Sequence, residues 1–146
     1  MKVAINGIGI AGPAIAYWLK ELGHEPVLFE KASALRAGGY LIDFWGHGYT
    51  IAERMGILPR LRARGYRMRR MRMVDHRGRE VAHVDLAPMR EALHGRFVSI
   101  ARADLANALF GACDRIPARF GVSITGLESN GVGTIATLSD GARENG

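Results

Sequence analysis

Hydrophobic and polar positions along the chain predict short strands that alternate with helices. Residues 2–6 form an apolar stretch typical of a buried strand, and residues 12–22 carry apolar side chains at helical spacing. Gly23 is placed to end that helix, and residues 26–30 predict a second strand. Two strands joined through a helix indicate a βαβ unit, whose strands must run parallel.

Beyond this unit the pattern predicts further strands and two helices. Arginine and methionine alternate between Arg67 and Met73, which indicates a strand with one solvated face and one packed face. A tight turn at residues 75–78 is expected to join this strand to a second one. The full set of later elements is a glycine-rich connection over residues 36–46, a helix over 49–55, strands over 67–74, 80–86 and 96–100, a helix over 104–113, and strands over 122–127 and 134–138.

The residues from Gly7 to Gly12 have the glycine pattern of a dinucleotide-binding loop, Gly7-Ile8-Gly9-Ile10-Ala11-Gly12. Gly7 permits a tight turn, Gly9 lets a pyrophosphate approach the backbone, and Gly12 lets the helix pack close to the strand. Glu30 lies 18 positions beyond Gly12 at the end of the second strand, where it can accept hydrogen bonds from ribose hydroxyls. The alternative is an ordinary glycine turn beside a surface glutamate. The motif alone does not separate FAD from NAD.

Other stretches carry a resemblance to a known family. They are Glu30-Lys31-Ala32 with Arg36, Gly38-Gly39, Ile42-Asp43 and Gly46, then residues 52–57 and 100–105. With residues 3–31 they resemble the FAD-dependent aromatic hydroxylase type of monooxygenase, typified by para-hydroxybenzoate hydroxylase and the tetracycline-inactivating monooxygenase. The resemblance covers essentially the whole chain and favours FAD over NAD.

The resemblance implies an α/β fold class: a Rossmann-like FAD-binding βαβ unit with added antiparallel strands, incomplete relative to the family. Residues 1–146 are expected to be the N-terminal part of one FAD-binding domain. The βαβ core would span residues 1–31, and residues 32–146 would include strands of a substrate-side sheet. The family's second FAD motif, which contains Gly-Asp, has no match here, because Asp140-Gly141 is better interpreted as a turn.

The resemblance also assigns roles to individual residues. Arg36 would lie near the flavin and the nicotinamide donor, Asp43 close to the flavin, and Arg102 would reach the FAD from the start of its helix. Taken singly, the two arginines could be surface residues and Asp43 could brace a turn. The expected cofactor-binding residues are Gly7, Gly9, Ala11, Gly12, Glu30, Lys31, Arg36, Asp43 and Arg102.

The implied reaction uses NADH or NADPH to reduce FAD, and O2 to form a flavin hydroperoxide that hydroxylates a small organic substrate, such as an aromatic compound. No catalytic side chain and no metal are expected, because the flavin carries the chemistry. Two alternatives stay open. One is an FAD-binding fragment or truncated product without turnover of its own, and the other is a flavin- or NAD-dependent dehydrogenase.

Composition adds a few limits. The net charge of +6 permits a nucleic-acid partner, but no reading motif surrounds the basic run, so none is expected. The five histidines lack metal-ligand spacing, and the single cysteine, Cys113, is expected to be packed. Tyr40, Phe44 and Trp45 are expected to pack in the core rather than touch flavin. With no long apolar stretch and one cysteine, we expect no membrane contact and a cytoplasmic location.

Overall fold

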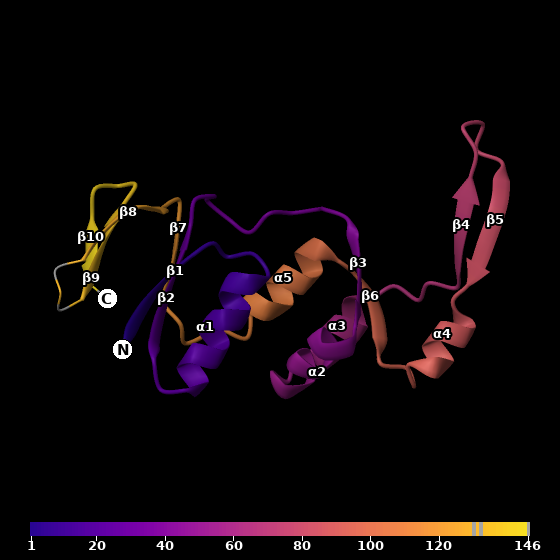
Figure 1. Ribbon diagram of the computed structural model, residues 1–146, viewed down its shortest axis with the longest axis horizontal. Coiled ribbons are helices and arrows are strands. Elements are labelled where there is room, and N and C mark those ends of the chain that lie inside the picture. The colour runs from indigo at the N-terminus through magenta and orange to yellow at the C-terminus, as the bar shows by residue number, and fades with distance from the viewer. Residues whose placement is uncertain (130, 132, 146) are drawn as a thin grey trace. The chain divides into compact units, whose positions relative to one another are not determined.

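The computed structural model describes residues 1–129, 131 and 133–145, and it divides into two compact units. Unit 1 combines Met1–Gly39 with Ala103–Gly146, and unit 2 is Tyr40–Arg102. In Figure 1 unit 2 is drawn in magenta to salmon, and unit 1 carries the indigo and the orange-to-yellow ends of the colour scale. Unit 2 is therefore an insertion between two segments that fold together.

Unit 1 is built on the predicted βαβ unit. Strand β1 (Lys2–Asn6), helix α1 (Ala11–Glu21) and strand β2 (Glu25–Glu30) follow one another, and the strands pair in parallel from Lys2↔Glu25 to Asn6↔Phe29. Gly23 stops the helix at a φ of 81°, in the left-handed region that favours glycine. Strand β7 (Ala118–Phe120) adds a third parallel strand, in the order β1-β2-β7.

Both faces of β2 are covered, which explains its continuous apolar sequence. On one face Leu28 belongs to a core cluster with Ala16 of α1 and with Cys113. Cys113 lies just after helix α5 (Arg102–Phe110). The next residue, Phe29, points the opposite way and packs with Val122 and Leu138. That second cluster belongs to an antiparallel sheet with the order β10-β9-β8, formed by β8 (Ile124–Ser129), β9 (Thr134–Leu138) and β10 (Arg143–Asn145).

Unit 2 is organised around an antiparallel pair, β3 (Leu41–Trp45) and β6 (Phe97–Ala101). Helices α2 (Gly46–Arg54) and α3 (Leu58–Arg64) accompany this pair. Tyr49 of α2 is completely buried, and its hydroxyl accepts a hydrogen bond of 2.5 Å from the guanidinium of Arg62. The guanidinium of Arg96 lies over the same ring at 4.8 Å, so two cations hold this tyrosine in place.

The second part of unit 2 is a hairpin of β4 (Arg70–Val74) and β5 (Glu80–Asp85), followed by helix α4 (Ala87–Ala92), which lies at the base of the hairpin (Figure 1). Register puts Met71 opposite Val84 and Met73 opposite Ala82, so these side chains share one apolar face. Met71, Met73 and Val84 are each 51% exposed. The predicted alternation is therefore confirmed, but the prediction that the methionine face is packed is wrong for this chain.

Other departures from the predicted elements have local causes. Residues expected to form only a glycine-rich connection include β3, because residues 41–45 find a partner in β6 far along the chain. The pattern missed the short elements α3, α4, β7 and β10, which are too brief to show a clear period. The expected packing of Tyr40 and Trp45 is wrong, since they are 70% and 55% exposed, whereas Phe44 is half-buried.

Candidate functional site

The glycine loop lies at the carboxyl end of β1, where the chain turns into α1. Gly7 has a φ of 112° and donates its N–H to the carbonyl of Phe29 at 2.6 Å. A Cβ added at Gly12 would lie 1.9 Å from the carbonyl oxygen of Gly7, so no side chain fits there. The loop is thus a closed turn that depends on glycine at both ends, as the sequence motif requires.

Glu30 ends β2 beside this loop and is bonded to it. One carboxylate oxygen accepts the N–H of Ile8 at 2.9 Å, and the other accepts the N–H of Ala32 at 3.0 Å. The hydrogen bonds from Ala32 and Ile8 hold the pKa of Glu30 below its usual value. The carboxylate is ionised at neutral pH, and each oxygen keeps a lone pair that can accept a ribose hydroxyl.

Two of the predicted cations follow β2 in the same unit. Lys31 and Arg36 are both exposed, and each exerts a small additional lowering on the pKa of Glu30 by its charge. The seven predicted residues of unit 1 are therefore gathered at the carboxyl ends of β1 and β2. They are Gly7, Gly9, Ala11, Gly12, Glu30, Lys31 and Arg36. Ligands of open parallel sheets bind at this edge.

The other two predicted residues belong to unit 2. Asp43 lies in β3 opposite Ser99, and its carboxylate accepts the Ser99 hydroxyl at 2.7 Å. Ser99 is completely buried, so this pair fixes the side chain of Asp43 in the strand rather than at a turn. Arg102 begins α5, and its N–H donates to the carbonyl of Tyr40 at 3.0 Å.

The residues of unit 1 fit a bound dinucleotide phosphate. Within the described chain no side chain caps the start of α1, and its first turn contains no acidic residue. The free N–H groups and the positive end of the helix dipole are therefore available to an anion. An added Cβ at Gly7 would meet no atom within 4 Å, so the loop leaves open space beside its backbone.

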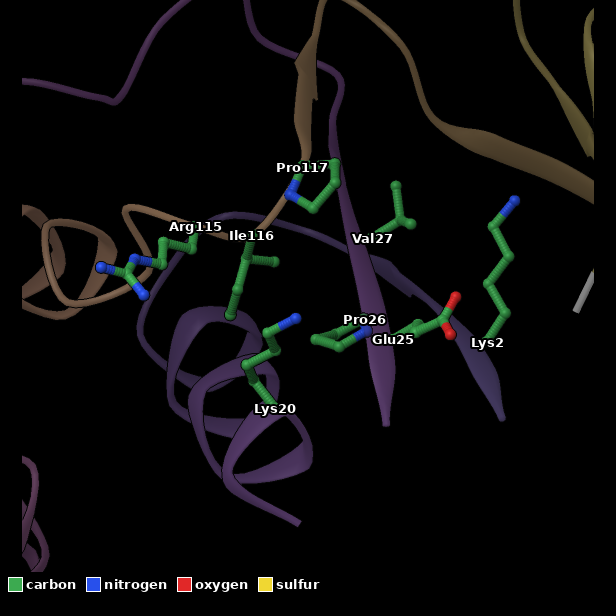
Figure 2. A pocket seen from close by; sticks show the side chains of 8 residues that line it. All are labelled: Lys2, Lys20, Glu25, Pro26, Val27, Arg115, Ile116 and Pro117. Carbon is green, nitrogen blue, oxygen red and sulfur yellow. The ribbon is translucent and has the colours of Figure 1, made fainter. Parts of the chain in front are cut away.

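A separate cavity of unit 1 does not belong to this site. It has a volume of about 420 Å³ and is lined by the amino ends of β1 and β2, the last turn of α1 and residues 115–117 (Figure 2). The guanidinium of Arg115 and the amine of Lys2 point away from each other on its two sides in Figure 2. It lies at the edge of the sheet opposite the glycine loop, which is not the edge where parallel sheets bind nucleotides.

The structure adds partners that sequence reasoning missed. The backbone N–H groups of Ile8 and Ala32 are the direct partners of Glu30, and the hydroxyl of Ser99 is the partner of Asp43. The backbone groups carry no sequence signal. Ser99 is the one polar residue in a run of apolar strand positions, which is a signal that could have marked it.

The geometry also bears on metal binding and on the single cysteine. In the described part of the chain no group of three or more histidine, cysteine or acidic side chains is placed to hold a metal. Cys113 is buried, and burial raises the pKa of its thiol to about 11, with the charge of Asp114 adding to the effect. It packs against α1, as expected, and is a poor nucleophile near neutral pH.

Comparisons with known proteins agree with this geometry. A flavin-dependent monooxygenase from an unknown prokaryotic organism is 37% identical over 145 residues, which are 99% of this chain and 37% of that relative. The crystal structure of Klebsiella pneumoniae HpxO complexed with FAD and uric acid superimposes with a TM-score of 0.81 at 26% identity. The superposition includes 100% of this chain and 37% of the HpxO chain. The chain is a homologue of part of the flavin-dependent monooxygenases.

The match supports the predicted fold class and family. The tetracycline destructase Tet(51) also superimposes with a TM-score of 0.81, at 28% identity, over 99% of this chain and 36% of that structure. The α/β fold with a Rossmann-like βαβ unit and added antiparallel strands is confirmed, as is its partial extent. The chain spans a little over a third of the length of the relatives it matches.

No family model matches the chain. None of the helices among the described residues is long and apolar enough to cross a membrane.

Proposed function

We propose that this chain is the FAD-binding part of a cytoplasmic monooxygenase that uses NADH or NADPH and O2 to hydroxylate a small organic substrate. The observation that carries the proposal is the closed loop at Gly7 and Gly12, with Glu30 bonded to the N–H of Ile8 behind it. The choice of FAD as cofactor is supported by the relatives, since HpxO was crystallised with FAD. Bound FAD supplies the redox chemistry.

Each residue of the chain has a positioning task in this proposal. The loop and the start of α1 hold the pyrophosphate, and Glu30 accepts the hydroxyls of the adenosine ribose. Lys31 and Arg36 offer positive charge beside them. Asp43, fixed by Ser99, and Arg102 serve the flavin end of the cofactor, as the family resemblance implies. None of these groups exchanges a proton or a covalent bond with the substrate.

A second candidate is an FAD-binding protein without turnover of its own. The chain matches only 37% of its prokaryotic relative, so contacts made by the other two-thirds of that relative are not supplied by these residues. In this reading the glycine loop and Glu30 keep the same roles, and only the reaction with oxygen and substrate is missing. The two candidates therefore share the test for FAD and differ in the test for turnover.

The first experiment identifies the nucleotide. The protein, or a version extended by the remaining part of its prokaryotic relative, is purified without added cofactor and denatured. The released nucleotide is identified by chromatography, with reconstitution in FAD as a second arm. We expect FAD and no NAD. Recovery of NAD without flavin would reject the assignment.

The second experiment tests the loop with a matched pair of glycine variants. Gly9 lies in the bend before α1 with a φ that other residues adopt, so Gly9→Val tests the approach of the pyrophosphate rather than backbone strain. We expect it to abolish FAD binding, measured by flavin fluorescence, and to leave the circular dichroism spectrum nearly unchanged. The control is Gly126→Val, because a Cβ there meets Thr137 at an ordinary 3.7 Å. Normal FAD affinity in Gly9→Val would mean that the loop is only a turn.

A further inference from the structure

The charge of the chain is concentrated in unit 2. This unit holds 13 arginines, no lysine and 6 acidic residues, which gives it a net charge of +7. Because the whole chain has a net charge of +6, unit 1 has a net charge of −1. The arginines are also unevenly placed within it. Four of them, Arg62, Arg67, Arg69 and Arg90, line two neighbouring cavities beside the base of the hairpin.

The two cavities share residues and are large enough for a small ligand. The first has a volume of about 570 Å³ and the second about 630 Å³, and both are lined by Arg67 and Arg90. Phe97 and Val98 give the first an apolar wall, and Pro88 gives one to the second. Sites for small molecules have volumes of this order and combine apolar walls with a few polar groups.

The segment that carries Arg67 and Arg69 is held in place by its backbone. Tyr66 donates its N–H to the carbonyl of Ser99 at 2.7 Å, and the carbonyl of Arg69 accepts the N–H of Leu86 at 3.0 Å. Between them, the guanidinium of Arg90 donates to the carbonyl of Met68 at 2.6 Å. The cavity walls are therefore fixed by the fold, and Arg90 is both a wall residue and a brace.

Among the residues described, none of the four arginines of this cluster forms an ion pair, and only Arg62 acts on an acidic group by its charge, that of Glu53. Asp85 is the one acidic residue that lines either cavity among the residues described, and it is bonded to Arg70 at 3.3 Å. In the described chain the guanidinium groups of Arg67 and Arg69 have neither a hydrogen-bond nor an ion-pair partner. Guanidinium groups gathered without counter-charges repel one another, and a bound anion relieves that repulsion.

We propose that this arginine cluster, Arg62, Arg67, Arg69 and Arg90, binds the phosphate monoester group of a small organic ligand. Arginine forks match phosphate oxygens in paired hydrogen bonds, and a phosphate monoester carries nearly two negative charges at neutral pH. The apolar walls and the exposed ring of Tyr66 suit the organic part of the ligand. The ligand is either NADPH, through its 2′-phosphate, or a phosphorylated substrate. Both carry a phosphate monoester. This site stands on unit 2 alone and does not depend on FAD binding.

The test is calorimetric titration of the 146-residue protein at low salt with four probes: NADPH, NADH, inorganic phosphate and a short single-stranded RNA. We expect saturable binding of NADPH that inorganic phosphate competes away. Arg67→Gln and Arg69→Gln should each weaken NADPH binding at least tenfold. The matched control is Arg77→Gln, which removes the same charge at the hairpin turn and should change the affinity less than twofold.

Further arms separate the sources of phosphate and the two proposals. NADPH binding at least fivefold tighter than NADH assigns the site to the reductant, whereas saturable binding of inorganic phosphate without binding of either dinucleotide assigns it to another phosphate monoester. Equal binding of the two dinucleotides would show that the 2′-phosphate is not recognised and would overturn the inference. Gly9→Val should leave phosphate binding unchanged, so failure of the FAD proposal would not remove this one. Absence of saturable phosphate binding would overturn the inference. An equal loss of affinity in Arg77→Gln, or RNA binding that outcompetes every small probe, would overturn it in favour of a general polyanion surface.

Discussion

Apolar strand residues are buried in unit 1 but remain half exposed in the hairpin of unit 2. In unit 1, strand β2 has apolar side chains on both faces, and both faces are buried in clusters that include Leu28 and Phe29. In unit 2, the β4–β5 hairpin has one apolar face at Met71, Met73 and Val84, and that face is half exposed. An apolar pattern therefore shows which face is suited to burial, and the rest of the fold determines whether burial occurs.

The largest expected effect concerns turnover. Residues 1–146 by themselves should give no NAD(P)H-dependent product and should bind FAD weakly if at all. The reason is that they match only 37% of the length of the flavin-dependent monooxygenase from the unknown prokaryotic organism. The exposed methionine face should also promote association. The 146-residue protein is compared with a chimera that joins it to the remaining part of the prokaryotic relative. Oxygen uptake, product formation and solubility are measured side by side.

This prediction has a clear contrary result. If the 146-residue protein is soluble, monomeric and couples oxygen to product as well as the chimera, the other two-thirds of the relative are not needed. The monooxygenase chemistry would then reside in these residues.

The next effect compares the two apolar patterns directly. Leu28→Ala removes a fully buried side chain and should lower the free energy of unfolding by about 2–5 kcal/mol. Met71→Ala removes a half-exposed one and should change it by no more than about 0.5 kcal/mol. Urea denaturation of both variants measures the difference. An equal loss in the two would show that the methionine face is covered in solution, for example by a second copy.

A smaller effect is expected at the glycine loop. Gly12→Ala places a Cβ against the carbonyl of Gly7, so the loop must shift, at a cost of about 1–3 kcal/mol, and FAD affinity should fall with it. Gly126→Ala makes only an ordinary contact with Thr137 and serves as the control. Thermal unfolding and flavin fluorescence measure the two consequences. Wild-type behaviour of Gly12→Ala would show that the loop has room for a side chain.

The smallest effect concerns Glu30. Its pKa is lowered in the folded protein, so its ionised form stabilises the fold above the unfolded pKa near 4.3, and this contribution is lost as pH falls through the folded pKa. Glu30→Gln should therefore be less stable than the natural protein at pH 7 by about 1 kcal/mol, the value of a typical hydrogen bond. The gap should close as the pH falls through the folded pKa, which lies below the unfolded value. A gap that stays constant with pH would assign the loss to packing.

The sequence predicted the parts of unit 1 that depend on neighbours in the chain. The βαβ unit, the glycine loop and the placement of Glu30 all follow from local periodicity and from the conformations that glycine allows. Strand β3 was missed because its pairing depends on Ser99 and its neighbours, more than fifty positions away. Side-chain contacts such as those of Glu30 with Ile8 and Ala32 could not be predicted, since their partners are backbone groups.

The insertion of unit 2 has a consequence for the order of folding during synthesis. Leu28 of β2 pairs with Ala118 of β7, ninety positions later, and the core around Leu28 also waits for Cys113 and Ile116. At about 5–20 residues per second, a ribosome needs roughly 5–18 s to supply them. During that time β1, α1 and β2 leave the ribosome with the Leu28 face uncovered, while the β4–β5 hairpin can already close from residues fifteen or fewer apart. Newly made chains should therefore depend on chaperones through the Leu28 face of this segment, which becomes buried only when the later residues arrive.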